Sequence, residues 1–451
     1  MDGQTPTHIS PPHVSFGEAF RTFGKIGLLS FGGPAGQIAL MHKVLVDEKK
    51  WIGEHRFLHA LNYCMLLPGP EAQQLATYVG WMLHRTPGAI AAGLLFILPG
   101  LFVIMALSAA YVMFLETRWL DIVFFGLKAA VLAIVVEALL RVARRALKTR
   151  MMVAVAMLAF LSLFLFHLPF PLVIAAAGAI GFLAAKWRPG LLAPTGHAPP
   201  DGPEAVDALA DVRSTLGRVI GITVVWLAIW ASLPLLLAAL FGWDSVYVPI
   251  AAFFSKMAVV TFGGAYAVLS YVAQEAVGTY HWLRPGEMLD GLALAETTPG
   301  PLIMVLTFVG FIAGFRDAAG LDPLMGGLLG GLLATWVTFA PCFLWILLGA
   351  PHVERLLGNR ALALALGTVT AAVVGVILNL ALWFGLHVLF AAHQPVALGP
   401  LTLELPVPSS VDLPALGLAA AAMVALLRLK WGVLPVLAAC CAAGAALRSL
   451  T

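Results

Sequence analysis

Charged residues divide the chain into long apolar stretches. Five of these stretches lie between consecutive charged residues, namely Arg85 to Glu116, Arg150 to Lys186, Arg218 to Asp244, Asp322 to Glu354 and Arg360 to Glu404. A helix needs about 20 apolar residues to cross the hydrocarbon core of a bilayer, and a charge at its centre is costly. The pattern therefore predicts an all-α, polytopic membrane protein.

About thirteen membrane elements follow from the apolar segments and their Gly, Pro and charged boundaries. We place them at 16–42, 57–83, 87–115, 120–143, 151–167, 171–186, 216–241, 247–275, 288–314, 323–349, 361–391, 413–427 and 431–447. A polar tail, 1–15, precedes them. Residues 187–215 are rich in proline and acidic residues and are predicted to form a solvated linker, followed by a connecting transmembrane helix at 216–245.

Composition narrows the class of protein further. The chain is 61% hydrophobic and 11% charged, and its net charge of +3 is too small and too dispersed to predict nucleic-acid binding. Cys64, Cys342, Cys440 and Cys441 lie in apolar segments without a C-x-x-C spacing, so neither a disulfide framework nor a metal site is expected. We expect no cofactor. The N-terminus lacks the pattern of a cleaved signal peptide.

The two halves of the chain are copies of each other. Phe31-Gly32-Gly33 aligns with Phe262-Gly263-Gly264, and Pro68-Gly69-Pro70 aligns with Pro299-Gly300-Pro301, both at an offset of 231 (262 − 31 and 299 − 68). The same offset aligns Trp51 with Trp282. Agreement of two motifs and a tryptophan at one offset predicts an internal duplication, with repeats at 16–186 and 246–451.

The distribution of Lys and Arg predicts that the two repeats have opposite orientations. Most basic residues fall in loops after even-numbered elements, and the remaining loops mix fewer of them with acids. By the positive-inside rule, the even loops and the N-terminus are cytoplasmic. With six elements in each repeat and one extra helix between them, the repeats are inverted. Inverted repeats are typical of secondary transporters, whose binding sites lie near the bilayer midplane.

The Phe-Gly-Gly and Pro-Gly-Pro motifs predict the position of the site. Glycine and proline interrupt helices, and irregular backbone at membrane depth is tolerated only inside protein or beside a wet cavity. A half-helix that starts after such a break directs free N–H groups and a partial positive charge at whatever lies beyond it. The glycines expected at this site are Gly32, Gly33, Gly69, Gly263, Gly264 and Gly300. Packing kinks are the alternative reading of one isolated motif.

Charged and polar side chains near the breaks support an anion site. Lys25 and Lys256 each lie in an apolar context at the same register, with Arg21 one turn before Lys25. They are expected to contact an anion, with snorkelling to the headgroups as the alternative. Neutral polar groups near the breaks are Ser30, Gln37, Asn62, Gln73, Gln74 and Thr261.

Two acids lie next to the breaks. Glu71 follows Pro70 directly, and Glu296 lies three residues before Pro299. A carboxylate at the start of a half-helix would compete with a bound anion, so Glu71 could bind or release a proton as substrate moves. A purely structural acid at a helix N-terminus is the alternative, and the pH dependence of a Glu71→Gln variant distinguishes the two.

Two stretches of the first repeat resemble a known family. The stretch 31–37 (FGGPAGQ) and the stretch 67–76 (LPGPEAQQLA) are similar to the chromate ion transporter family in its long, two-repeat form, over essentially the whole chain. The resemblance implies export of chromate through the bacterial inner membrane, resistance to chromate, and sulfate as a chemically similar competitor. The second repeat departs from the motif, with Leu302 in place of Glu71 and Ala265 in place of Pro34.

Other functions remain as alternatives. A transporter of sulfate or another oxyanion differs little in chemistry from a chromate transporter. A membrane-embedded enzyme would need a nucleophile and a base, and the chain has no Gly-x-Ser-x-Gly or His-Glu-x-x-His motif. The expected partners are a chromate- or sulfate-like dianion and membrane lipid, and a homodimer is left open.

Overall fold

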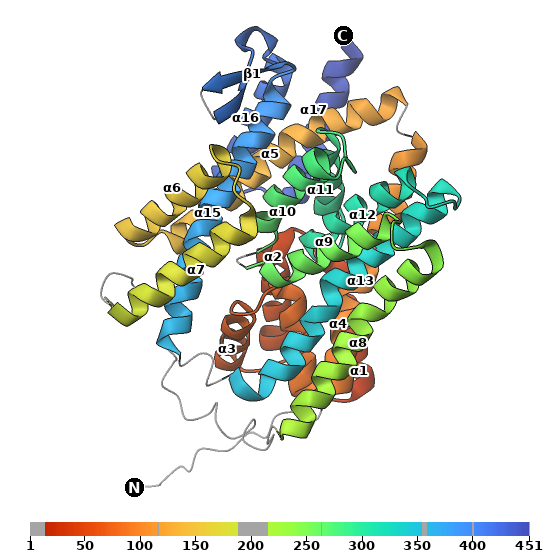
Figure 1. Ribbon diagram of the computed structural model, residues 1–451, viewed down its shortest axis with the longest axis vertical. Helices are drawn as coiled ribbons and strands as arrows, with labels where there is room; N and C mark the ends of the chain where they lie inside the picture. Colours follow the sequence, from red (N-terminus) through yellow and green to blue (C-terminus); the bar gives the residue numbers. More distant parts are fainter. Residues whose placement is uncertain are drawn as a thin grey trace.

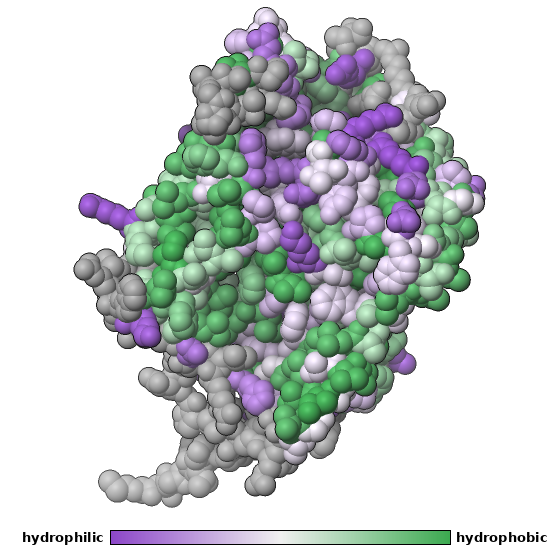
Figure 2. All heavy atoms as spheres, in the orientation of Figure 1, coloured by the Kyte–Doolittle hydropathy of each residue, from purple (hydrophilic) through white to green (hydrophobic). Residues whose placement is uncertain are grey.

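The protein is helical and its surface is largely apolar. The computed structural model describes residues 14–114, 117–187, 215–262, 264–353, 359–398 and 401–450, which form helices apart from one β-hairpin (Figure 1). Among these residues, five helical segments are long and apolar enough to cross a membrane. Exposed leucine, isoleucine and phenylalanine side chains cover α6 (Arg150–Phe164), α7 (Phe170–Trp187) and α8 (Leu216–Phe241), on two sides of the view in Figure 2. The chain is therefore a multi-pass membrane protein.

The first repeat begins with interrupted helices. Helix α1 (Phe16–Leu29) ends just before the Phe-Gly-Gly motif, and α2 (Gly33–His42) starts inside it and continues into a π-helix, η1 (Lys43–Glu48). Helix α3 (Glu54–Cys64) ends before Pro-Gly-Pro, and α4 (Glu71–Phe114) starts after it. Helix α4 is sharply bent at His84 and Arg85, so it consists of two helices that form a hairpin.

The second repeat has the same order of elements. Helix α9 (Tyr247–Val260) has the bounds of α1 shifted by 231 (247 − 16). Then come α10 (Ala265–Gln274), a π-helix, η3 (Glu275–Thr279), and α11 (Glu287–Thr297). A 3-10 turn, η4 (Leu302–Met304), leads into α12 (Val305–Arg316), which forms a hairpin with α13 (Pro323–Gly349).

Glycines allow the two helices of each hairpin to approach closely. A Cβ atom on Gly80 would lie 2.3 Å from the carbonyl oxygen of Gly88, and one on Gly314 would lie 2.3 Å from that of Gly326. Gly330 lies equally close to Gly310. Gly326 and Gly330 thus serve close helix packing.

The remaining helices exchange partners between the repeats. The long helices α5 (Arg118–Ala146) and α15 (Arg360–Leu389) correspond at an offset of 242 (360 − 118). Helix α15 packs on α6 and α7 of the first repeat, whereas α5 packs on α16 (Leu413–Leu427) and α17 (Val433–Leu450) of the second. Each repeat thus completes the core of the other.

The structure corrects several predicted boundaries. The segments 16–42, 57–83, 247–275 and 288–314 are each divided at the break that their motif predicted, but part of 57–83 joins 87–115 in α4, which was not predicted. The connection before α16 holds strands β1 (His393–Leu398) and β2 (Leu401–Pro406), an antiparallel hairpin that the apolar pattern did not predict. It was missed because it is short and lies between two long apolar helices. Two further 3-10 turns are η5 (Ala350–His352) and η6 (Pro408–Ser410).

Candidate functional site

The four breaks meet where the two repeats contact each other. The N–H of Gly69 donates to the carbonyl oxygen of Thr261 at 2.8 Å, and the N–H of Gly300 donates to that of Ser30 at 2.7 Å. Both the donors and the acceptors differ by 231 in sequence, so the two bonds are reciprocal. Each Pro-Gly-Pro turn is therefore fixed to the end of the first helix of the other repeat.

Glycine is required in both Pro-Gly-Pro turns. Gly69 has a φ of +120° and Gly300 a φ of +95°, a region that side chains with a Cβ atom rarely occupy. The space is also restricted, because a Cβ atom on Gly69 would lie 2.9 Å from Cys342 Sγ. On Gly300 it would lie 3.3 Å from the carbonyl oxygen of Phe96.

A narrow, largely enclosed cavity of about 10 Å³, with room for about one water molecule in this conformation, lies between the breaks. The residues that line it come from the starts of α2, α4, α10 and the η4–α12 segment: Pro34, Gln37, Pro70, Glu71, Ala72, Gly264, Ala265, Pro301, Leu302 and Ile303. Four helical N-termini, two from each repeat, thus line one cavity.

This arrangement favours a negative charge in the cavity. The first N–H groups of a helix have no partner within that helix, and the aligned peptide dipoles place a partial positive charge at the N-terminus. Four such ends around one cavity supply oriented donors without a metal or a cofactor.

Polar side chains of the first repeat lie at or near the cavity, where Gln37 and Glu71 line it and Gln73 and Gln74 do not. Gln37 Nε2 donates to the carbonyl oxygen of Gly300 at 2.5 Å, which links α2 to the Pro-Gly-Pro turn of the second repeat. Gln74 Nε2 donates to the carbonyl oxygen of Pro68 at 2.7 Å, and Gln73 Nε2 bonds Thr77 Oγ1 at 2.9 Å. The three glutamines are buried, and their Oε1 atoms accept no hydrogen bond from the protein.

The second repeat offers an apolar wall instead. At the positions equivalent to Glu71, Gln73 and Gln74 it has Leu302, Met304 and Val305, all buried. The cavity is therefore polar on one side and apolar on the other.

Comparisons with known proteins match this architecture. A family model described as "Chromate transporter" matches residues 17–182 and 248–445, one region in each repeat. The chain belongs to the chromate transporter family. It is 33% identical over 376 residues to a chromate transport protein of Pseudomonas aeruginosa, covering 82% of this chain and 81% of the relative. A chromate transport protein of Cupriavidus metallidurans is 30% identical over 357 residues, covering 79% of each chain. No solved structure matches the chain.

The predicted cations of this transporter do not line the cavity. Arg21, Lys25 and Lys256 are exposed, and Lys256 Nζ donates to the Tyr271 hydroxyl at 3.2 Å. The buried stripe of α1 runs through Ala19, Thr22, Phe23, Ile26 and Gly27, and Lys25 falls outside this stripe. In this conformation the helical period turns these side chains away from the core, and their predicted contact with an anion stays a prediction.

Other cations lie closer to the transporter's acids. Arg145, near the C-terminal end of α5, interacts electrostatically with Glu71, and Arg141 interacts in the same way with Glu296. Arg141 is paired with Glu137, one turn earlier on the same helix, Nη2 to Oε2 at 2.5 Å. Sequence reasoning assigned Arg141 and Arg145 to a cytoplasmic loop, since nothing local indicates that α5 returns to the site.

Glu296 lies behind the cavity with a tyrosine partner. The Tyr266 hydroxyl donates to Glu296 Oε1 at 2.5 Å, and Glu296 Oε2 is buried and accepts no hydrogen bond from the protein. Tyr266 follows Ala265, a lining residue, and sequence reasoning did not identify it. Its aromatic ring beside the break was the one available signal.

The remaining predicted residues fall around these elements. Ser30 and Thr261 are buried, and their hydroxyls donate to carbonyls of their own helices while their carbonyls accept the reciprocal bonds. Gly32, Gly33 and Gly264 have positive φ values at the starts of α2 and α10. Asn62 is half-buried on α3 and does not line the cavity. Gly263 lies outside the described residues.

Proposed function

We propose that this protein is a secondary transporter that binds chromate between the repeats, in a state in which this cavity is wider, and exports it from the cytoplasm, which makes the cell resistant to chromate. The observation that carries the proposal is the set of four helical N-termini lining one cavity. The two relatives described above are chromate transport proteins, which supports chromate as the substrate. A tetrahedral dianion needs several oriented donors, and backbone N–H groups at helix ends provide them.

The two repeats are proposed to have inverted topology. The matched bounds of α1 and α9 and the reciprocal bonds of Gly69 and Gly300 support a two-fold relation. The distribution of Lys and Arg supports an axis in the membrane plane, with the N-terminus in the cytoplasm of a bacterial cell and the chain in its inner membrane. The cavity is formed by residues of one chain, so the pathway itself does not require a homodimer.

The membrane potential can drive the export. Moving one elementary charge across 100 mV changes its free energy by about 2.3 kcal/mol, which is about 4.6 kcal/mol for a dianion leaving an inside-negative cell. The chain has no Gly-x-x-x-x-Gly-Lys-Ser/Thr loop, so ATP is not the proposed source of energy.

Glu71 is proposed to couple transport to protons. Its carboxyl group lines the cavity at the first residue of α4, where the anion is proposed to bind. An ionised Glu71 and a dianion in the same cavity repel each other, and protonation of Glu71 removes that repulsion.

Flux measurements in vesicles test the proposal. Chromate uptake into inside-out vesicles, with the pH gradient and the potential set independently, should require the protein and should increase when the vesicle interior is made positive. Competition by sulfate decides between a chromate transporter and a general oxyanion transporter. An enzyme would instead release a chemically altered product, so recovery of unchanged substrate inside the vesicles is the matching control.

A further inference from the structure

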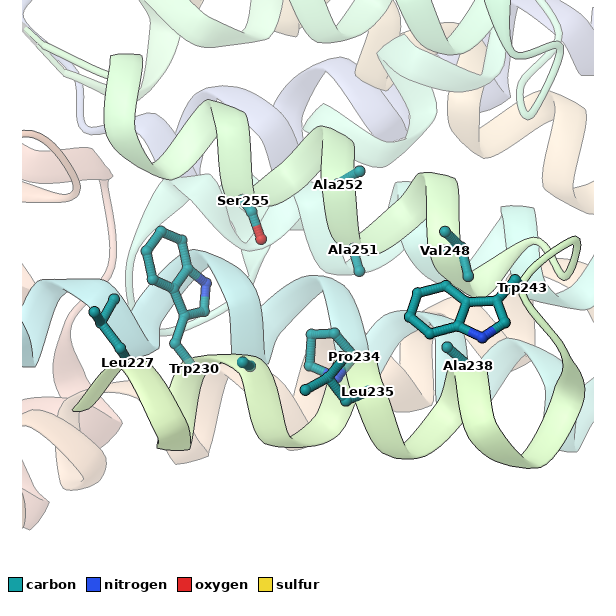
Figure 3. A pocket seen from close by; sticks show the side chains of 11 residues that line it. Leu227, Trp230, Pro234, Leu235, Ala238, Trp243, Val248, Ala251, Ala252 and Ser255 are labelled. Atoms are coloured by element: carbon teal, nitrogen blue, oxygen red, sulfur yellow. The ribbon is translucent and has the colours of Figure 1, made fainter. Parts of the chain in front are cut away.

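An apolar groove separates α8 from α9 on the outer surface of the helix bundle. Two stripes of side chains face each other across it, drawn in Figure 3: Leu227, Trp230, Ala231, Pro234, Leu235 and Ala238 on α8, and Val248, Ala251, Ala252 and Ser255 on α9, with Trp243 at the end where the helices join. Its volume is about 480 Å³. Both stripes have the spacing of a helix face that normally packs against another element.

The groove exists because α8 is held elsewhere. The Trp336 indole N–H of α13 donates to the carbonyl oxygen of Ile229 at 2.9 Å, and Trp226 stacks on Phe343 of α13. Near the junction with α9, Phe241 contacts Tyr247 with ring centroids 5.2 Å apart. Pro234 cannot donate to the carbonyl of Trp230, which allows α8 to bend between these attachments. Alanines on both walls would permit closer contact, yet the helices stay apart.

We propose that this groove binds one acyl chain of a membrane phospholipid, with the headgroup at the Trp243 end. The surroundings face lipid, since Leu227, Leu235 and Leu240 are exposed on α8. Trp243 is 69% exposed and precedes Asp244, a combination typical of the membrane–water interface. Ser255 and the indoles of Trp230 and Trp243 are the polar groups among the lining side chains, and Trp230 Nε1 is buried without a partner in the protein.

The dimensions of the groove fit an acyl chain better than a helix from a second copy of the protein. The stripe from Leu227 to Ala238 extends for about 17 Å at 1.5 Å per residue. One leaflet of the hydrocarbon core is about 15 Å thick, so the groove matches the depth of one chain. The volume divided by this length gives a cross-section of about 30 Å². A helix about 10 Å across would need about 80 Å².

The groove lies against α9, a helix of the second repeat that ends beside the anion cavity. Helix α9 leads to Thr261, whose carbonyl oxygen accepts the N–H of Gly69 beside the cavity. A chain in the groove therefore lies along the outer side of a helix that helps to hold the Pro-Gly-Pro turn. This inference does not depend on which anion the protein transports.

Native mass spectrometry of the full chain, purified in mild detergent from membranes of phosphatidylethanolamine and phosphatidylglycerol, tests the site. The wild type should retain one phospholipid per chain. Ala252→Phe, which fills the groove from an exposed position, should lower this occupancy at least fivefold. Ala239→Phe, also at an exposed alanine but outside the groove, should leave it unchanged. A wild type without bound lipid, equal loss in both variants, or a dimer in place of the lipid would overturn the proposal.

Fluorescence quenching gives a second test, which does not require a substitution that fills the groove. In vesicles whose phospholipids carry bromine near the end of the chain, the emission assigned to Trp230 by difference from Trp230→Phe should be quenched more strongly than that of Trp243. Bromine near the carbonyl should reverse the order. Equal quenching of both tryptophans by both lipids would contradict the proposed orientation of the chain.

Discussion

The half-helix pair α2 and α3 and its counterpart α10 and α11 have the same motifs but different environments. In α10, eight of ten residues are buried, and in α11 ten of eleven. In α2 only three of ten are buried, and in α3 four of eleven. The same sequence motifs thus produce the same backbone breaks in both repeats. The half-helices beside those breaks are buried in the second repeat and more exposed in the first. The molecule is closed over the second repeat and more open over the first.

Buried ion pairs hold the closed side. Lys128 Nζ of α5 lies 3.1 Å from Asp290 Oδ1 of α11, and the Tyr111 hydroxyl donates to Asp290 Oδ2 at 2.9 Å. Arg316, the last residue of α12, pairs at 2.6 Å with Glu287, the first residue of α11. The first repeat has Arg56 and His59 at the positions equivalent to Glu287 and Asp290. Under the proposed inverted relation, exchanging the two environments would open the cavity to the opposite side of the membrane.

The largest effect is expected at the Pro-Gly-Pro turns. Gly69→Ala should abolish transport and lower the free energy of unfolding by about 1–3 kcal/mol, because it combines a positive φ with a contact too short for a Cβ atom. Gly300→Ala, with a longer contact, should be milder. Thermal unfolding in detergent and vesicle flux measure both. Gly217→Ala, where no atom lies within 4 Å, is the control, and an equal loss there would refute the argument.

The next effect concerns the closed side. Asp290→Asn should lower the free energy of unfolding by about 1–3 kcal/mol, because Lys128 loses its buried partner but keeps some contact with solvent. The double variant Asp290→Asn with Lys128→Met should recover part of this loss, since no unpaired charge remains. Thermal unfolding of the double variant and of each single variant provides the comparison. A double variant as unstable as the sum of the single changes would show that the pair is not coupled.

The pH dependence of chromate binding should distinguish the polar wall of the cavity, which contains Glu71, from the apolar wall. For the wild type, chromate binding should strengthen as the pH falls, because protonation removes the negative charge from the cavity. Glu71→Gln should bind at high pH as the wild type does at low pH, with a gain of about tenfold, or about 1.4 kcal/mol. Leu302→Gln, at the equivalent position of the other repeat, should keep the pH dependence. Unchanged pH dependence in Glu71→Gln would end the coupling hypothesis.

The smallest effect is expected at the lysines. Lys25→Ala and Lys256→Ala should change chromate affinity by less than about threefold, or about 0.6 kcal/mol, because both side chains are exposed and lie outside the cavity. Equilibrium binding at low salt measures this. A loss of a hundredfold or more would show that these lysines turn inward in the state that binds substrate.

The backbone of the site was more predictable than its side chains. Gly69 and Gly300 act locally, so their motifs alone predicted the breaks and the offset between the repeats. The apolar pattern of α1 already places Lys25 outside the buried stripe. The prediction that Lys25 contacts an anion relied instead on its matching register with Lys256. The approach of Arg145 to Glu71 depends on how α5 crosses the bundle, and local sequence carries no such information. The same holds for which Pro-Gly-Pro turn meets which helix end.

Chromate binding to a variant with a negative charge added to the apolar wall tests the central claim most directly. Equilibrium dialysis of the purified protein against chromate should show one bound ion per chain in the wild type and in Ile303→Asn. In Ile303→Asp the bound chromate should disappear, since a carboxylate would be added to the cavity that the four N-termini line. Wild-type affinity in Ile303→Asp, with unfolding unchanged, would contradict the account.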